Sequence, residues 1–238
     1  MNTNDESKIL EGGVLMNTND VSKILESEKE KYVREKSEKY ISEGLDKSTA
    51  VNKANQSWRA YVGSKIQEYI FNQLKSALEN QGLKIITDKE LKSKNLPEEL
   101  EQVKRLLSID YGDYLFLPDA DIIVYKKIPK ERGIKNIKIL AIVSVKNSFR
   151  ERGFETTYWK KKLSESKITS HIKVFIATPD KDNEISYRLS KNNNPRKMRI
   201  ILEYELDGIY FLKDNFEKTD KTKHFDEIIN DILKLVSK

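Results

Sequence analysis

The sequence predicts an α/β protein in which helices flank a mixed central β-sheet, with a helical elaboration at the N-terminus. Three observations lead to this prediction. Apolar residues recur at helical spacing over a long segment that ends near Gly82, several short apolar runs between residues 83 and 212 have the length of β-strands, and the C-terminal segment is amphipathic again. We therefore expect a helical region in residues 16–82 and a core domain in residues 83–238.

Residues 1–15 stand apart from this division. The run MNTNDESKILE at Met1 is repeated as MNTNDVSKILE at Met16, which indicates a duplicated or disordered N-terminal segment that adds nothing to the fold. Residues 23–43 are rich in charge and contain few apolar side chains, so a surface helix is expected there.

The strongest periodic pattern predicts a helix from Thr49 to Asn80, with Ser48 as its N-cap and Gly82 after its end. Its buried face would consist of the apolar residues that recur every three or four positions: Val51, Ala54, Trp58, Val62, Ile66, Ile70, Leu74 and Leu78. Glu68 lies beside this stripe, where a carboxylate is either a solvated charge or part of a functional site.

The remaining elements follow from shorter patterns. Buried-type apolar runs predict strands at residues 83–87, 115–125, 137–146 and 171–178. Amphipathic spacing predicts helices after Pro97, at residues 155–164 and at residues 224–236. The Asp207-Gly208 pair between two apolar runs predicts a β-hairpin of residues 199–206 and 209–212.

Composition excludes several classes of function. The chain of 238 residues has no cysteine and two histidines, which excludes disulfides, thiolate chemistry and an all-histidine metal site. It has neither a run of the roughly 20 apolar residues that cross a bilayer nor a secretory signal, so we expect a soluble, cytoplasmic protein with no membrane partner.

The net charge of +6 suits an acidic partner such as nucleic acid. The basic surplus is concentrated between Ser144 and Lys173, where eight Lys or Arg stand against three Glu. The alternative is a solvated basic surface without a partner.

Two pairs of polar residues lie at strand boundaries. Asp119 and Asp121 precede one apolar run, and Ser144 and Lys146 end another. Side chains alternate along a strand, so the members of each pair share a face. If the strands are neighbours, these groups can form a compact site for a hard metal ion held by carboxylates. The alternative is an ordinary turn at the aspartates and an edge lysine on the strand.

Three motifs occur in a characteristic order: PD at Pro118, SVK beginning at Ser144, and RER beginning at Arg150. This order resembles the PD-(D/E)xK nuclease core in its serine variant, in particular type II restriction endonucleases of the BsaWI-like group that recognise CCGG-containing sites. The resemblance implies Mg²⁺-dependent, sequence-specific hydrolysis of double-stranded DNA. A palindromic site of this kind is most simply cut by a homodimer.

The resemblance also suggests roles for individual residues. Asp121 is the first candidate for a metal ligand and Asp119 the second, and the backbone carbonyl of Val145 could supply another oxygen. Lys146 would stabilise the transition state or act on the attacking water. Ser144 carries no charge, so another acid must complete the metal site.

Two glutamates compete for that last position, Glu155 and Glu68. In the serine variant the acid comes from the following helix, about one turn beyond Glu155, where this sequence has Trp159 and Lys160. A G-x-x-I-E helix element of the family has Gln67 in its acidic position here, with Glu68 next to it. The choice between the two glutamates stays open.

DNA contacts are expected from the basic segment that follows the second motif: Arg150, Glu151, Arg152, Lys160 and Lys161. Arginine binds guanine bidentately in the major groove and glutamate accepts from cytosine, so the RER run can read G·C pairs; the alternative is contact with phosphates. Two other functions remain open: a catalytically silent nucleic-acid-binding domain on a nuclease-like fold, and a structure-specific repair or junction nuclease.

Overall fold

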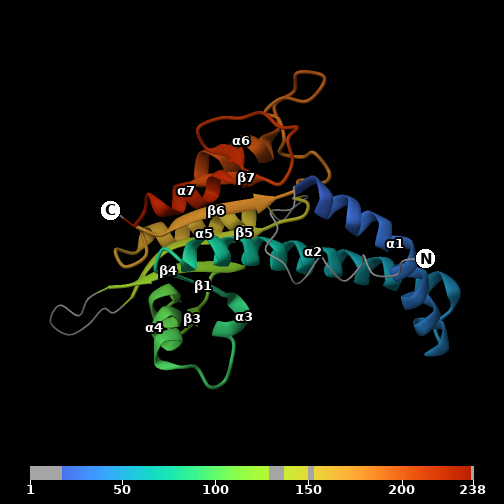
Figure 1. Cartoon of the computed structure of the whole chain (residues 1–238), viewed down its shortest axis with the longest axis horizontal. Coiled ribbons are helices and arrows are strands. Elements are labelled where there is room, and N and C mark those ends of the chain that lie inside the picture. The colour runs from blue at the N-terminus through green and yellow to red at the C-terminus, as the bar shows by residue number, and fades with distance from the viewer. Residues whose placement is uncertain (1–17, 129–136, 150–152, 237–238) are drawn as a thin grey trace. The chain divides into compact units, whose positions relative to one another are not determined.

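The computed structural model describes residues 18–128, 137–149 and 153–236 (Figure 1). The chain divides into two compact units, Met1–Ala54 and Asn55–Lys238, and the boundary falls within helix α2, Lys47–Glu79. Within the described ranges, no helix is both long and apolar enough to cross a membrane.

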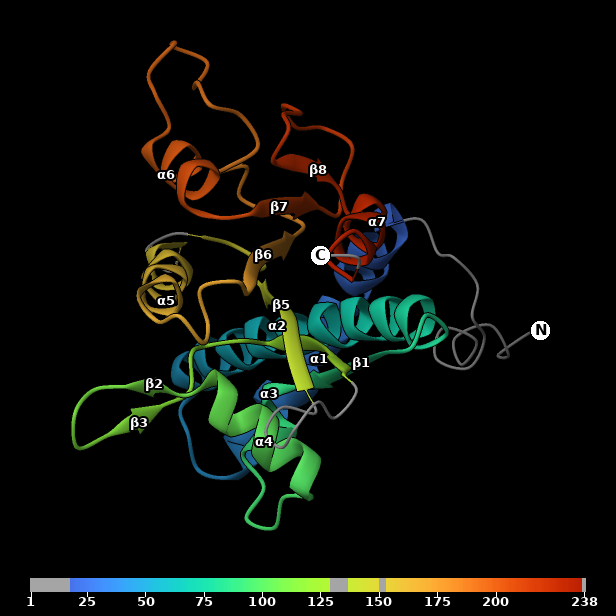
Figure 2. The ribbon, with the colours of Figure 1, turned by 90° about the vertical axis from the view of Figure 1, so that its left-hand side faces the viewer.

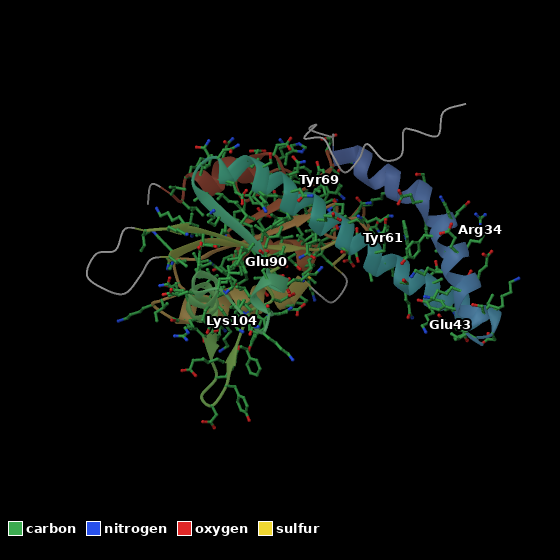
Figure 3. The ribbon with its side chains drawn as sticks, turned by 60° about the horizontal axis from the view of Figure 1, so that its bottom comes forward. Arg34, Glu43, Tyr61, Tyr69, Glu90 and Lys104 are labelled. Atoms are coloured by element: carbon green, nitrogen blue, oxygen red, sulfur yellow. The ribbon has the colours of Figure 1, made fainter. Side chains whose placement is uncertain are left out.

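The first unit contains helix α1, Thr18–Ser42, and the start of α2. Charged side chains such as Arg34 and Glu43 are exposed on it, so the expected surface helix is confirmed (Figure 3). The chain turns between the helices at Gly44, whose φ of +97° lies in the left-handed region that glycine tolerates.

The predicted N-cap of α2 is wrong. The helix begins at Lys47, and the capping group is the carboxylate of Asp46. Its Oδ1 accepts hydrogen bonds from the backbone N–H groups of Ser48 and Thr49, at 3.0 and 3.1 Å. Hydrogen bonds from Thr49 lower the pKa of Asp46. Because an ionised carboxylate satisfies two unpaired N–H groups here, Ser48 moves inside the helix.

The second unit is built on a six-stranded sheet with the order β1-β4-β5-β6-β7-β8 (Figure 2). Its strands are β1 (Leu83–Thr87), β4 (Ile122–Lys127), β5 (Ile137–Val145), β6 (Lys173–Thr178), β7 (Gly208–Phe211) and β8 (Thr222–His224). The pairs β1–β4 and β4–β5 are antiparallel, and the pairs from β5 to β8 are parallel. The predicted fold class, a mixed sheet with flanking helices, is confirmed.

Helices cover both faces of this sheet. They are α3 (Asp88–Leu91), α4 (Glu98–Leu107), α5 (Gly153–Glu165), α6 (Lys197–Glu205), α7 (Glu227–Leu233) and the second part of α2. Figure 2 shows α5 and α6 on one side of the sheet and α2 and α7 on the other. A buried hydrophobic cluster joins the first side to the strands, for example through Leu163, Leu202 and Ile176.

An irregularity in β5 decides which way its C-terminal side chains point. Tyr125 and Val124 of β4 are consecutive, but they pair with Ile139 and Ala141, so Leu140 is an extra residue in the ladder. Ile139 and Ile142 consequently belong to the same buried cluster, although they are three positions apart. A β-bulge of this kind re-aims the residues that follow it.

A buried ionic network ties α6 to β8 and the loop before it. The fully buried Arg199 donates to Glu203, 3.1 Å away, and to Thr222 Oγ1, 2.9 Å away. Burial alone would raise the pKa of Glu203, but hydrogen bonds from Arg188, Thr219 and Arg199 outweigh it and lower the pKa to about 2. This network makes the carboxylate of Glu203 a stabilising group at neutral pH.

Two of the predicted strands differ from the structure. The run at residues 115–125 is interrupted: β3, Leu115–Phe116, pairs with β2, Ile109–Asp110, in a separate hairpin, and the sheet strand β4 begins at Ile122. Pro118 and the polar residues after it break the run, because proline cannot donate to a ladder. The strand expected at residues 171–178 is β6 and begins two residues later.

The hairpin predicted at residues 199–206 and 209–212 is wrong. Residues up to Glu205 form α6, and only the second run is a strand, β7. The buried residues Arg199, Leu202 and Leu206 recur at helical spacing. Arg199 is charged, so a search for periodic apolar residues does not detect the start of this buried face. The predicted final helix is shorter, because His224 ends β8 and α7 begins at Glu227.

Candidate active site

The ends of β4 and β5 bring the predicted acidic and basic residues together. Ile122 pairs with Val143 across the antiparallel ladder, so Asp121, just before β4, lies beside the end of β5. Its Oδ2 accepts a hydrogen bond of 2.6 Å from the backbone N–H of Val145 and lies 3.5 Å from Ser144 Oγ. The predicted meeting of Asp121 with the second motif therefore exists in the structure.

Lys146 connects the first motif to helix α5. Its Nζ lies 3.0 Å from Asp119 Oδ2 and 4.0 Å from Glu155 Oε2, and its side chain is 11% exposed. Two carboxylates from different elements thus converge on one nearly buried ammonium group. The bulge at Leu140 produces this arrangement, since it directs Ser144 and Lys146 to the side of the sheet that carries α5.

The floor of the site is buried. Ser144 is 1% exposed, and its Oγ accepts a hydrogen bond of 3.3 Å from Thr156 of α5. Burial raises the pKa of Asp121, against the opposing effects of the Val145 N–H group and the Lys146 charge. Burial destabilises the ionised form of a carboxylate. A cation beside the carboxylate stabilises that form.

On the other face of the sheet, α2 contributes Gln67. Its Nε2 donates to the backbone carbonyl of Asp121 at 3.2 Å, which holds the start of β4 in place. Glu68 points elsewhere: it is about half exposed and its Oε2 lies 3.0 Å from Lys65 Nζ on the same helix. The geometry therefore places Glu155, and not Glu68, next to the catalytic lysine candidate.

Sequence reasoning missed Asp88. Thr87 of β1 pairs with Ile122 of β4, so Asp88, the next residue, is positioned next to Asp121. Asp88 forms an ion pair of 2.5 Å with Lys92, and that hydrogen bond is the main cause of the raised pKa of Lys92, with the charges of Asp119 and Asp121 adding to it. The only sequence feature that could have indicated Asp88 was its position directly after a predicted strand. Acidic residues are common at such positions, so this feature does not distinguish a site residue.

A cleft of about 250 Å³ opens beside these groups. Its lining includes Asp88, Lys92, Asp119, Glu155 and Trp159. It exposes acidic groups from three different elements to the same volume, so a ligand that carries or brings positive charge fits it.

The donor set can be compared with the needs of a divalent cation. Within the ranges that the structure describes, no three Asp, Glu or His side chains stand close enough to hold a metal ion as they are. Mg²⁺, however, is commonly held by one or two carboxylates with retained waters. Asp121 and Asp119 meet this need, and Lys146 is the cation that now neutralises part of the cluster. The residues present fit Mg²⁺.

The predicted DNA-binding residues differ in where the structure places them. Arg150, Glu151 and Arg152 lie outside the described residues. Lys161 is exposed on α5. Lys160, by contrast, donates to Asp207 at 2.5 Å, and its side chain is only 15% exposed. Its ammonium group therefore forms an ion pair within the fold.

Comparison with known proteins identifies the family. The family model described as "BsaWI restriction endonuclease type 2" matches residues 99–235, more than half of the chain. The "Putative type II restriction enzyme MjaVIP" of Methanocaldococcus jannaschii is 63% identical over 227 residues, which cover 95% of this chain and 98% of that protein. The chain is a type II restriction endonuclease of the BsaWI family.

Two further matches agree with this assignment. The "Probable type II restriction enzyme HpyAORF263P" of Helicobacter pylori is 45% identical to this restriction endonuclease over 161 residues, 68% of this chain and 80% of that protein. Among solved structures, "Restriction endonuclease PspGI-substrate DNA complex" has the same fold, with a TM-score of 0.59 at 16% identity, over 98% of this chain and 83% of that chain. The family assignment makes DNA cleavage the activity of this restriction endonuclease.

Proposed function

We propose that this restriction endonuclease uses Mg²⁺ to hydrolyse double-stranded DNA at a palindromic, G·C-containing site of the CCGG type, and that it acts as a homodimer. The observation that carries the proposal is the convergence of Asp119 and Glu155 on Lys146, beside Asp121 at the end of the neighbouring strand. Carboxylates of this kind can hold Mg²⁺, and a neighbouring lysine can stabilise the charge that develops during phosphodiester hydrolysis.

Asp121 and Asp119 would hold the cation, with the backbone carbonyl of Val145 as a further oxygen ligand. When bound, Mg²⁺ supplies neutralisation of the phosphate charge and orientation of the attacking water. The hydrogen bond from the Val145 N–H engages Oδ2 of Asp121 and holds this carboxylate beside the end of β5.

Ser144 makes this enzyme a serine variant of the PD-(D/E)xK core. A buried hydroxyl that already accepts from Thr156 contributes no charge to the site. Glu155 would supply the missing acid, because its carboxylate is 4.0 Å from Lys146 Nζ and lines the cleft. The ion pair of Glu68 with Lys65 argues against the alternative.

The ammonium group of Lys146 would stabilise negative charge on the phosphate as the bond to the leaving oxygen breaks. Its burial and its two carboxylate neighbours, Asp119 before β4 and Glu155 on α5, define the position of this ammonium group. A preorganised charge of this kind costs no rearrangement during the reaction.

Sequence reading is assigned to Arg150, Glu151 and Arg152, which directly precede α5 in the chain. Arginine pairs bidentately with guanine and glutamate accepts from cytosine, so these residue types suit a G·C core. Lys161, exposed on α5, would add a phosphate contact, whereas Lys160 is committed to Asp207. A two-fold dimer would present two such sets to a palindrome.

The first experiment is digestion of a supercoiled plasmid with purified enzyme in Mg²⁺ and, in parallel, in EDTA. The expected result is discrete linear fragments in Mg²⁺ and intact plasmid in EDTA. Discrete fragments in EDTA would contradict the metal requirement. A smear in Mg²⁺ would contradict site specificity.

A further inference from the structure

One side chain in the wall of the cleft carries a buried hydrogen-bond donor without an acceptor. The indole Nε1 of Trp159 is shielded from water, and no acceptor lies within reach in the part of the chain that the structure describes. A buried N–H group of this kind loses the hydrogen bonds that it makes with water in the unfolded chain, so native proteins retain few of them. An unpaired donor beside a cluster of acids therefore calls for an explanation.

Helix geometry directs this donor toward Glu155. Trp159 follows Glu155 by four residues on α5, so the two side chains lie on the same face of the helix, one turn apart. Aromatic side chains in helices point back toward the N-terminus, over the residues three and four positions earlier. Both residues also line the same cleft. Glu155 is therefore the acceptor that the helix itself offers to the indole N–H.

The carboxylate of Glu155 is only loosely held. Its Oε2 lies 4.0 Å from Lys146 Nζ, which is too long for a hydrogen bond, and its side chain is 49% exposed. Asp119, by contrast, accepts a hydrogen bond of 3.0 Å from the same ammonium group. An ionised carboxylate has two oxygens and about four acceptor positions. Glu155 can therefore bind a cation through one oxygen and accept a hydrogen bond on the other.

The ring of Trp159 is fixed by its neighbours. It meets the ring of Tyr158 edge-on, with centroids 5.2 Å apart, and it packs against the buried hydrophobic cluster of the core. Side chains packed at the density of a protein interior cannot shift far. We therefore expect the exposed carboxylate of Glu155 to turn toward the indole, and the indole to stay in place.

We propose that Trp159 is a positioning residue for metal binding: its indole N–H donates to the Glu155 carboxylate when that carboxylate binds a divalent cation. This rests on the proposed function, in which Glu155 supplies the missing acid, and adds the group that orients this acid. Carboxylates that bind metal ions are themselves hydrogen-bonded, and loss of such a partner typically costs about 10–100-fold in metal affinity. Donation to a DNA phosphate is disfavoured, because Nε1 is buried.

The first measurement follows the indole N–H itself. The chain has two tryptophans, so a proton–nitrogen correlation NMR spectrum of the isotopically labelled full chain shows two indole signals, and Trp58→Phe identifies that of Trp159. Titration with Mg²⁺ in the absence of DNA should move the Trp159 proton signal downfield, because a new hydrogen bond deshields the proton. Glu155→Ala should abolish this shift. Glu68→Ala, which removes a carboxylate from α2, is the matched control and should preserve it.

The second measurement is the Mn²⁺ affinity of the DNA-free protein, determined by electron paramagnetic resonance. Trp159→Phe removes the donor and keeps an aromatic ring, so it should weaken Mn²⁺ binding at least about tenfold. Trp58→Phe, the same substitution at a buried position of α2, is the control and should leave the affinity unchanged. If Trp159→Phe does not fold, the indole signals of the wild type and of Glu155→Ala decide the question.

An indole signal that saturating Mg²⁺ does not move would overturn the proposal, and so would a shift that persists in Glu155→Ala. Folded Trp159→Phe with wild-type Mn²⁺ affinity would also overturn it, including the case in which that variant loses only thermal stability or DNA affinity. If Glu155→Ala weakens Mn²⁺ binding and Trp159→Phe does not, the proposed function stands and this inference alone fails. A wild type that binds no Mn²⁺ would overturn both.

Discussion

Replacing Lys146 with Met should have two opposite effects: cleavage slows by about 10²–10³-fold, and a divalent cation binds more tightly. The structure explains both. The ammonium group lies 3.0 Å from Asp119 and 4.0 Å from Glu155, so it competes with a cation for the same carboxylates. During the reaction the same charge would stabilise the phosphate, and methionine cannot replace it.

The tightening can be estimated from these distances. Opposite unit charges 4 Å apart attract by about 4 kcal/mol at an effective dielectric constant of about 20. The side chains of Asp119 and Glu155 are 37% and 49% exposed, so solvent screening reduces the competing attraction to about 1–2 kcal/mol. Since about 1.4 kcal/mol changes a dissociation constant tenfold, that of the cation should fall about 5- to 30-fold.

Two assays measure the two effects separately. Single-turnover cleavage at saturating Mg²⁺ gives the chemical rate, and titration of the DNA-free protein with Mn²⁺, followed by electron paramagnetic resonance, gives the cation affinity. Lys65→Met, which removes a lysine paired with Glu68 on α2, is the control and should change neither. Unchanged or weaker cation binding in Lys146→Met would refute the competition, and a rate within about tenfold of wild type would refute the catalytic role.

Four further predictions follow from the same structure. Asp121→Asn should abolish cleavage and weaken Mn²⁺ binding while DNA affinity, measured by gel shift in Ca²⁺, stays within about threefold; intact cleavage would remove Asp121 from the metal site. Glu155→Gln should lower the cleavage rate at least about tenfold and raise the Mg²⁺ concentration for half-maximal rate, whereas Glu68→Gln should behave as wild type; the reverse order would exchange the two assignments. Glu203 has a folded-state pKa of about 2 against about 4.5 when unfolded, so its contribution of about 2 kcal/mol is complete above pH 4.5 and is lost as the pH falls toward 2. Glu203→Gln should therefore lower the free energy of urea unfolding at pH 7 by about this amount and flatten its decline below pH 4.5, and an unchanged acid profile would count against the network. Arg150→Ala should cost about 1–3 kcal/mol at one base pair and little elsewhere; an even loss on all sequences with a salt slope reduced by about one would mean phosphate contact instead.

The central part of the site was predictable because it depends on short-range rules. Alternation along strands paired Ser144 with Lys146, and an apolar run after Asp121 placed that acid at the start of a strand. Antiparallel pairing then brings the two strand ends together without further information. Burial on both faces also marked β5 as a central strand.

The parts that could not be predicted depend on register and on packing between distant elements. The extra residue at Leu140 sets the face of Lys146, but nothing in an unbroken apolar run shows where a bulge lies. Whether Glu155 or Glu68 reaches the lysine depends on where α5 and α2 dock. Helix α6 was mistaken for a strand because its buried face begins with Arg199. Two guanidinium nitrogens of this arginine donate to partners that are distant in the sequence, including Ile185 and Glu217.

The most direct test of the account is a map of every cut end on a sequenced plasmid after complete digestion in Mg²⁺. The account predicts that all ends derive from a single palindromic sequence with a G·C core, symmetrically cut on both strands, and that Asp121→Asn prepared in the same way produces no ends. Ends that share no common sequence, ends centred on an A·T-only sequence, or the same map from Asp121→Asn would contradict it.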